Sequence, residues 1–208
     1  MANPTIEELH NPAEFELIAE LEHPHIKSFV LDQLAKGGKL VTVFMIYQIV
    51  MMTLGIWVIT RAIIFAINQS TAPLIMTGIA LFFSFSALIP MHELLHGIAL
   101  KFTGAKEIHY GAYLRKFIFY AEADSHVLNK SQFTFVALTP LVIVKLLTGG
   151  GILFFLSSPI SYFMIIIMVT HSFFCAGDIG LLNVFCRFND VYTYDVRKKK
   201  KSYYFKRI

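Results

Sequence analysis

The chain has 208 residues, of which 56% are hydrophobic and 15% are charged, and its mean hydropathy is +0.61. This composition is too apolar for an ordinary soluble domain and is typical of a protein that crosses a membrane several times. The net charge is +4, but no nucleic-acid-binding motif or stacking platform accompanies it, so we expect no nucleic-acid partner. The two cysteines, Cys175 and Cys186, form no Cys-x-x-Cys pattern, which argues against a disulfide framework and a thiolate metal site.

Residues 1–39 are the polar part of the chain, and we expect them to form two short cytoplasmic amphipathic helices. Asn11-Pro12-Ala13-Glu14 has the residue types that begin a helix, and apolar residues follow it at helical spacing. Pro24 ends this first helix. A second helix is predicted over residues 26–34, and Gly37-Gly38 ends it. We see no pattern of a cleaved signal peptide.

Residues 40–186 are predicted to form a membrane core with about four transmembrane helices. The apolar runs cover about 40–67, 74–100, 133–156 and 160–185, each near the roughly 20 residues that cross a bilayer. In the third run, Pro140, Lys145 and the glycines after them predict a kinked or broken helix, or one that stops early. The fold class is therefore a mainly α, polytopic membrane protein.

The Lys and Arg residues predict the orientation of these spans. Sixteen of the 18 lie before the first span, between the second and third, or after the fourth. With four spans, these three segments share one side, which the positive-inside rule makes cytoplasmic, together with both termini. Residues 187–208 are then a basic cytoplasmic tail near lipid head groups. The other two, Arg61 and Lys145, are expected to reach outward from the spans.

The cytoplasmic segment between the second and third spans is rich in aromatic and β-branched residues. It is predicted to be a short β-hairpin or an extended segment, with an irregular amphipathic loop as the alternative. The edge of such a strand can bind an extended peptide by β-addition.

His92-Glu93-Leu94-Leu95-His96, near the end of the second run, is a His-Glu-x-x-His motif. Residues four apart share one face of a helix, so His92 and His96 can bind one metal ion. Glu93 can then reach a water on that metal, which is the arrangement of zinc metalloproteases. The alternative is a helix whose polar residues only make structural hydrogen bonds.

Asp178, in the fourth run, is the expected third metal ligand. His96 lies five residues before Lys101 and Asp178 nine before Arg187, about 7–8 and 13–14 Å along a helix. Both therefore belong to the cytoplasmic half of the membrane. A catalytic zinc needs three protein ligands and an open position for water. The alternative for Asp178 is a buried carboxylate paired with Lys or Arg.

His171 lies two helical turns before Asp178 and would share its face on a straight helix. It can hydrogen-bond a metal ligand, stabilise the oxyanion or replace Asp178 as ligand, and it can equally be a structural interhelical histidine. Asn183 is a weaker oxyanion candidate. The remaining histidines are expected at the surface or in structural roles: His10, His23, His25, His109 and His126.

The motif from His92 to Gly97 on an apolar helix, followed by Gly177-Asp178 on a later span, resembles the putative zincin peptidase family of membrane metallopeptidases. This family is similar to the site-2 protease-like intramembrane metalloproteases, and the resemblance covers roughly residues 74–187. It implies His92, His96 and Asp178 as zinc ligands and Glu93 as general base. The asparagine- and proline-containing pattern of site-2 proteases is absent before Asp178, so the resemblance assigns no oxyanion residue.

These patterns predict a zinc-dependent membrane peptidase that hydrolyses a peptide or membrane-protein substrate near the cytoplasmic face. One alternative is an inactive metal-binding scaffold or regulatory protein. The other is a metal transporter, which would need polar residues continuing to the far side, and the first halves of the second and fourth runs have few.

Overall fold

The computed structural model describes residues 3–113 and 118–208, which form two compact units. The first, here called the sheet unit, contains Met1–Val41, Glu93–Thr139 and Gly177–Ile208. The second, the helical unit, contains Thr42–His92 and Pro140–Ala176. Each unit is assembled from segments that are far apart in the sequence.

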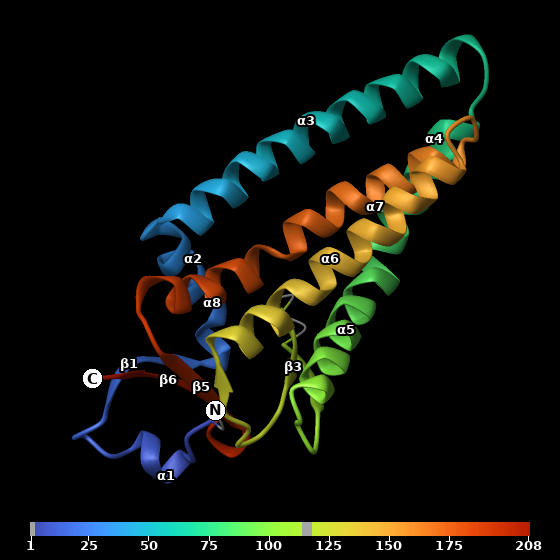
Figure 1. Cartoon of the computed structure of the whole chain (residues 1–208). Coiled ribbons are helices and arrows are strands. Elements are labelled where there is room, and N and C mark those ends of the chain that lie inside the picture. Colours follow the sequence, from blue (N-terminus) through green and yellow to red (C-terminus); the bar gives the residue numbers. More distant parts are fainter. Residues whose placement is uncertain (1–2, 114–117) are drawn as a thin grey trace. The chain divides into compact units, whose positions relative to one another are not determined.

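An antiparallel four-stranded sheet forms the centre of the sheet unit, with strand order β1-β6-β5-β4 (Figure 1). The strands are β1 (Phe15–Glu22), β4 (Leu128–Asn129), β5 (Val191–Val196) and β6 (Lys201–Arg207). The short helix α1 (Ile6–Leu9) and the 3-10 turns His23–His25 and Arg197–Lys199 flank the strands. The C-terminal end of the chain lies beside this sheet.

The helix predicted from Asn11 to Pro24 is wrong, because most of this segment forms β1. The register of β1 on β6 shifts between Leu17 and Ala19, which inserts one extra residue as a bulge. Phe15 packs in a cluster with Leu9, whereas Leu21 packs in a different cluster. The apolar spacing that resembles a helix thus serves two separate clusters of a bulged strand.

The basic tail predicted over residues 187–208 is also folded into the sheet, as β5 and β6. Lys200 has a φ of 53° in the turn between them. Lys206 pairs with Glu16 of β1 at 2.9 Å, and Lys201 pairs with Glu22 at 3.2 Å. The partner strand β6 and β1 lie near opposite ends of the sequence, so local sequence could not indicate that they pair.

The second predicted N-terminal helix is confirmed as α2 (Ile26–Ala35). Gly37, with a φ of 65°, follows its end. Buried Asn183 donates from Nδ2 to the carbonyls of Gln33 and Gly37, at 2.9 and 3.0 Å. Asn183 therefore holds the C-terminal end of α2, which accounts for its side chain without an oxyanion role.

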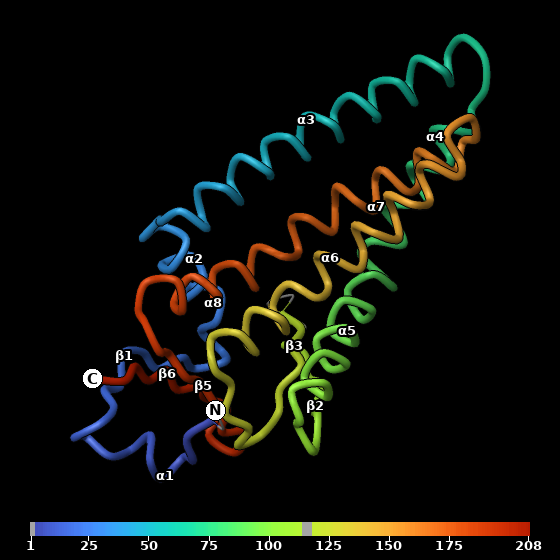
Figure 2. Tube along the Cα trace, in the orientation of Figure 1, coloured from blue at the N-terminus to red at the C-terminus, as the bar shows by residue number. Residues whose placement is uncertain are grey.

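The predicted hairpin is confirmed as β2 (His109–Tyr113) and β3 (Ile118–Glu122), and its tip lies outside the described residues. Figure 2 shows β2 beside α5 (Ile89–Phe102). A Cβ atom added to Gly97 would lie 1.9 Å from the Tyr110 hydroxyl. The glycine after His96 thus makes room for the hairpin.

Among the described residues, three helices are long and apolar enough to cross a membrane: Lys39–Asn68, Ala72–Phe102 and Lys130–Phe154. They correspond to α3 (Lys39–Asn68), to α4 (Ala72–Phe83) joined to α5 through a π-helical turn (Ser84–Leu88), and to α6 (Lys130–Phe154). α7 (Ile160–Phe174) and α8 (Ala176–Arg187) make a fourth span if the pair, bent by 44°, counts as one. In the helical unit, α4 packs against α7.

The break therefore falls in the fourth apolar run and not in the third. α6 runs through Pro140 and all three glycines. The bend between α7 and α8 removes the straight helix on which the shared face of His171 and Asp178 depended.

Candidate metal centre

Helix α5 carries the whole His-Glu-x-x-His motif and separates it from an apolar face. Met91, Leu94 and Ile98 are 46%, 51% and 42% exposed. His92 and His96 are 5% and 8% exposed and lie on the opposite side of the helix. The exposed stripe suits lipid, while the histidines are held inside the protein.

In the sheet unit, His96 is fixed through both ring nitrogens. Its Nδ1 lies 3.0 Å from the carbonyl oxygen of Val136 on α6. A carbonyl only accepts, so Nδ1 carries the hydrogen and donates it. Nε2 then faces Asp178 Oδ1 at 3.1 Å.

The acceptor of His96 is available because of the sequence of α6. Pro140 lies inside that helix and has no N–H. The carbonyl four residues earlier, that of Val136, therefore lacks its usual helical donor and can accept from His96. The proline that predicted a broken helix instead frees a hydrogen-bond acceptor for a motif histidine.

Asp178 lies in the first turn of α8, directly after the bend. Its side chain is 15% exposed, and the N-terminal end of a helix favours a negative charge. The bend thus places the Asp178 carboxyl group at a helix N-terminus within the apolar run.

In the helical unit, His92 Nδ1 lies 3.0 Å from Nε2 of His171, which is fully buried. His171 Nδ1 lies 3.6 Å from Sγ of buried Cys175, one turn further along. Contact with a motif histidine, one of the roles expected for His171, is present in the structure.

Ligand atoms of His92, His171 and Cys175 lie within 4.8 Å of one another, so they could also hold a metal ion. The cysteine count had argued against a thiolate site, because no Cys-x-x-Cys pattern exists. His171 and Cys175 are four apart on a helix, and that spacing was the signal available in the sequence.

Other polar residues have structural partners. The prediction that Lys145 reaches outward is wrong, because its ammonium donates to the Met168 carbonyl and lies 5.4 Å from the centre of the Tyr47 ring. His126 Nε2 lies 3.0 Å from the Thr103 hydroxyl. His23 was expected at the surface but is 7% exposed.

A family model described as "Putative zincin peptidase" matches residues 85–192, just over half of the chain. The chain belongs to this family. The matched region of this zincin-family chain contains the motif on α5, the β2–β3 hairpin, α6 and Asp178. No curated protein and no solved structure gave a match.

Proposed function

We propose that this chain is a zinc-dependent, membrane-embedded peptidase in which His92, His96 and Asp178 hold the metal. The observation that carries the proposal is the pair formed by His96 Nε2 and Asp178 Oδ1, 3.1 Å apart, with Nδ1 of His96 already committed to Val136. A second hydrogen bond that fixes the ring is typical of metal-binding histidines.

His92 completes the proposed ligand set through the helical spacing of the motif. Its Nδ1 contacts His171, and in this proposal Nε2 binds the ion. Two imidazoles and one carboxylate, with a fourth position open, are a common donor set of catalytic zinc. In this proposal His171 orients His92 and does not itself bind the metal.

Zinc in such a site supplies a Lewis acid that lowers the pKa of a water and polarises the scissile carbonyl. Glu93, next to His92 on α5, acts as the general base: it accepts the proton of the attacking water and returns it to the leaving amine. The substrate is a peptide or membrane protein, and the similarity to site-2 protease-like enzymes is part of the proposal.

The β2–β3 hairpin is the proposed substrate platform. Among the described strands, β2 pairs only with β3, which leaves its other edge for an extended peptide. The packing of Tyr110 against Gly97 fixes β2 to the motif helix.

Substitution of Glu93 tests the mechanism. In proteoliposomes with a peptide library and mass-spectrometric detection of new ends, Glu93→Gln should keep about one zinc and lose cleavage. Asp178→Ala should lose the zinc. Ala112→Pro on β2 should reduce cleavage but keep the zinc. The matched control is Glu107→Gln, whose side chain is 82% exposed and lies just beyond α5.

Cleavage by Glu93→Gln at the unmodified rate would refute this mechanism. Zinc without cleavage in the unmodified protein would favour the metal-binding scaffold instead. Equal loss of zinc and cleavage in Ala112→Pro would count against the hairpin as substrate platform.

A further inference from the structure

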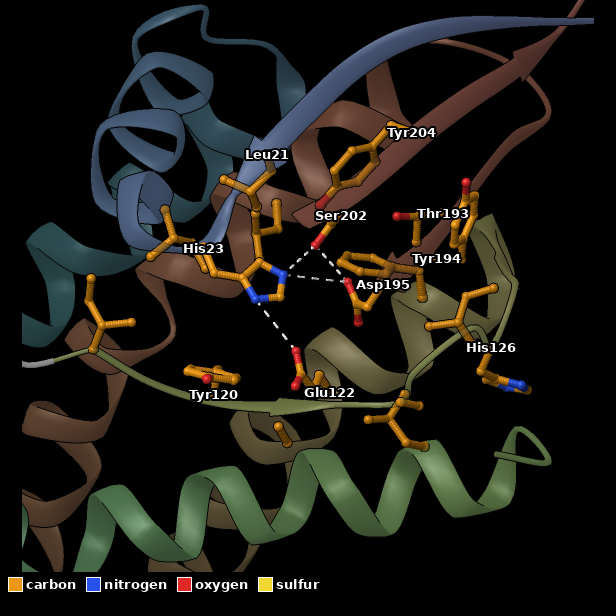
Figure 3. Close-up of a pocket in the computed structure, with 18 residues that line it drawn as sticks. Leu21, His23, Tyr120, Glu122, His126, Thr193, Tyr194, Asp195, Ser202 and Tyr204 are labelled. Atoms are coloured by element: carbon orange, nitrogen blue, oxygen red, sulfur yellow. Dashed lines mark hydrogen bonds and ion pairs between the residues drawn. The ribbon is translucent and has the colours of Figure 1, made fainter. Parts of the chain in front are cut away.

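A cavity of about 120 Å³ lies in the core of the sheet unit (Figure 3). Its lining is mostly apolar and includes Leu21, Ile26 and Leu100. Polar side chains from four separate segments also line the cavity: His23, Glu122, Asp195 and Ser202. None of them belongs to the proposed zinc site.

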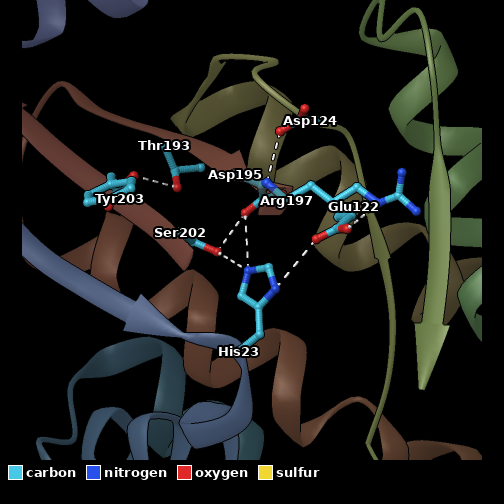
Figure 4. A network of polar contacts seen from close by, with 8 residues as sticks. All are labelled: His23, Glu122, Asp124, Thr193, Asp195, Arg197, Ser202 and Tyr203. Carbon is cyan, nitrogen blue, oxygen red and sulfur yellow. Dashed lines mark hydrogen bonds and ion pairs between the residues drawn. The ribbon is translucent and has the colours of Figure 1, made fainter. Parts of the chain in front are cut away.

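The hydrogen bonds around His23 determine which of its nitrogens carries the hydrogen (Figure 4). The Ser202 hydroxyl donates to Asp195 Oδ1 at 2.6 Å. Its oxygen therefore accepts from His23 Nε2, at 3.0 Å. In the neutral ring, Nδ1 is then an acceptor, and burial lowers the pKa of His23 despite the nearby Asp195 carboxylate.

His23 Nδ1 faces Glu122 Oε2 at 3.5 Å. That oxygen is buried without a hydrogen-bond partner, and the Glu122 side chain is only 6% exposed. With Glu122 ionised, two acceptors therefore converge on the cavity with no hydrogen between them. A buried carboxylate oxygen in this position is costly unless a donor, and preferably a cation, reaches it.

The charged groups around Glu122 do not supply a hydrogen-bond donor to Oε2. Arg197 Nε lies 3.6 Å from the other oxygen, Oε1, and the Arg197 side chain is 55% exposed. Asp195 and Asp124 add negative charge, and Asp124 accepts from the backbone N–H of Arg197 at 2.9 Å. Asp195 lines the cavity, and both aspartates add negative charge near Glu122.

We propose that this cavity binds the primary ammonium group of a small alkylamine, which donates to Glu122 Oε2 and His23 Nδ1. The alkyl part lies against the apolar lining, and the aromatic rings of Tyr120 and Tyr204 add attraction for a cation.

A metal ion fits this cavity poorly. Asp195 lies 4.0 Å from His23 Nε2, whereas Glu122 faces Nδ1, so the two carboxylates approach opposite sides of the ring. They do not converge on one point with the imidazole. Calcium needs about six to eight oxygen ligands, which a mainly apolar cavity does not offer.

The test uses the full-length protein in detergent, titrated with n-propylammonium chloride and followed by calorimetry and methyl NMR. Neutral 1-propanol is the ligand control. We expect propylammonium to bind and to shift the methyl signals of Leu21 and Ile26, whereas propanol binds at least about tenfold more weakly. Burial and the Asp195 carboxylate raise the pKa of Glu122 to about 7, so binding at pH 7 should release protons.

Glu122→Gln should weaken propylammonium binding by about tenfold or more, since a charged hydrogen bond is lost. Glu16→Gln is the matched control, because that side chain is 57% exposed and pairs with Lys206 on the sheet surface. Ala123→Leu fills the cavity while keeping every polar group, and it should also abolish binding.

Equal binding of propanol, unchanged affinity in Glu122→Gln, or no binding to the unmodified protein would each overturn the proposal. Calcium in place of propylammonium as the ligand would do the same. A peptide with one lysine and blocked termini identifies the source of the amine. If the peptide competes with propylammonium, the ligand is a lysine side chain. If the peptide does not compete, the ligand is a free amine.

Discussion

Glu122 is a carboxylate that folding removes from water, and its surroundings favour the protonated form. Burial and the neighbouring Asp195 carboxylate raise its pKa from the ordinary 4.5 to about 7, although the Arg197 guanidinium opposes this. Between these two pH values the native state binds more protons than the unfolded state, so stability falls as pH rises. The stability that Glu122 contributes is fully present below about pH 4.5 and is lost as the pH rises through about 7.

Replacement of Glu122 by glutamine removes this pH dependence. We expect Glu122→Gln to unfold at a higher temperature than the unmodified protein at pH 8, with a difference that shrinks toward pH 5. Thermal unfolding in detergent at pH 5, 6, 7 and 8 measures it, with Glu16→Gln as the exposed control. A difference that stays constant across this pH range would contradict the account.

At the scale of the elements, α6 supports the motif because Pro140, inside this helix, has no N–H. Pro140 leaves the Val136 carbonyl free to accept from His96. Pro140→Ala restores a competing N–H, so the ring of His96 should be held less firmly. We expect zinc affinity to fall about tenfold to a hundredfold, the usual effect of losing such a supporting hydrogen bond.

Competition with a chelator at equilibrium measures this affinity. Pro159→Ala is the control, because Pro159 occupies the N-cap position of α7, twelve residues before His171. Unchanged zinc affinity in Pro140→Ala would show that the Val136 carbonyl does not support the metal centre.

Elements were predictable where their signals are local. Periodicity and Gly37 indicated α2, and aromatic and β-branched residues indicated the β2–β3 hairpin. β1 was not predictable, because its bulge gives a helix-like spacing and its partner β6 lies at the other end of the chain. The bend at Cys175 follows no proline, so the sequence favoured Pro140 as the site of the break.

The candidate site was predictable to the same extent. The spacing of His92, Glu93 and His96 is local, and helix α5 carries all three. The Val136 carbonyl could not be inferred, since a backbone group has no sequence signal of its own. Cys175 was not predicted, because the typical thiolate patterns are cysteine pairs, whereas Cys175 is a single cysteine one helical turn after His171.

At the scale of the whole molecule, the two cysteines can test the orientation proposed for the chain in a membrane. Cys186 is exposed near the end of α8, whereas Cys175 is buried. If the basic segments face the cytoplasm, a membrane-impermeant maleimide should label Cys186 in inverted vesicles and not in intact cells. Cys186→Ser should remain unlabelled in both, and labelling of intact cells would reverse the proposed orientation.

The central question is which of two ligand groups holds the metal. One is the proposed set of His92, His96 and Asp178, and the other, His92, His171 and Cys175, contains sulfur. X-ray absorption at the zinc edge of the purified, zinc-loaded protein distinguishes them, because zinc–sulfur distances are about 2.3 Å and zinc–nitrogen or zinc–oxygen distances about 2.0–2.2 Å. The account predicts nitrogen and oxygen neighbours only, with two imidazoles among them. A sulfur neighbour that disappears in Cys175→Ser would place the metal at His92, His171 and Cys175 and contradict the proposed peptidase site.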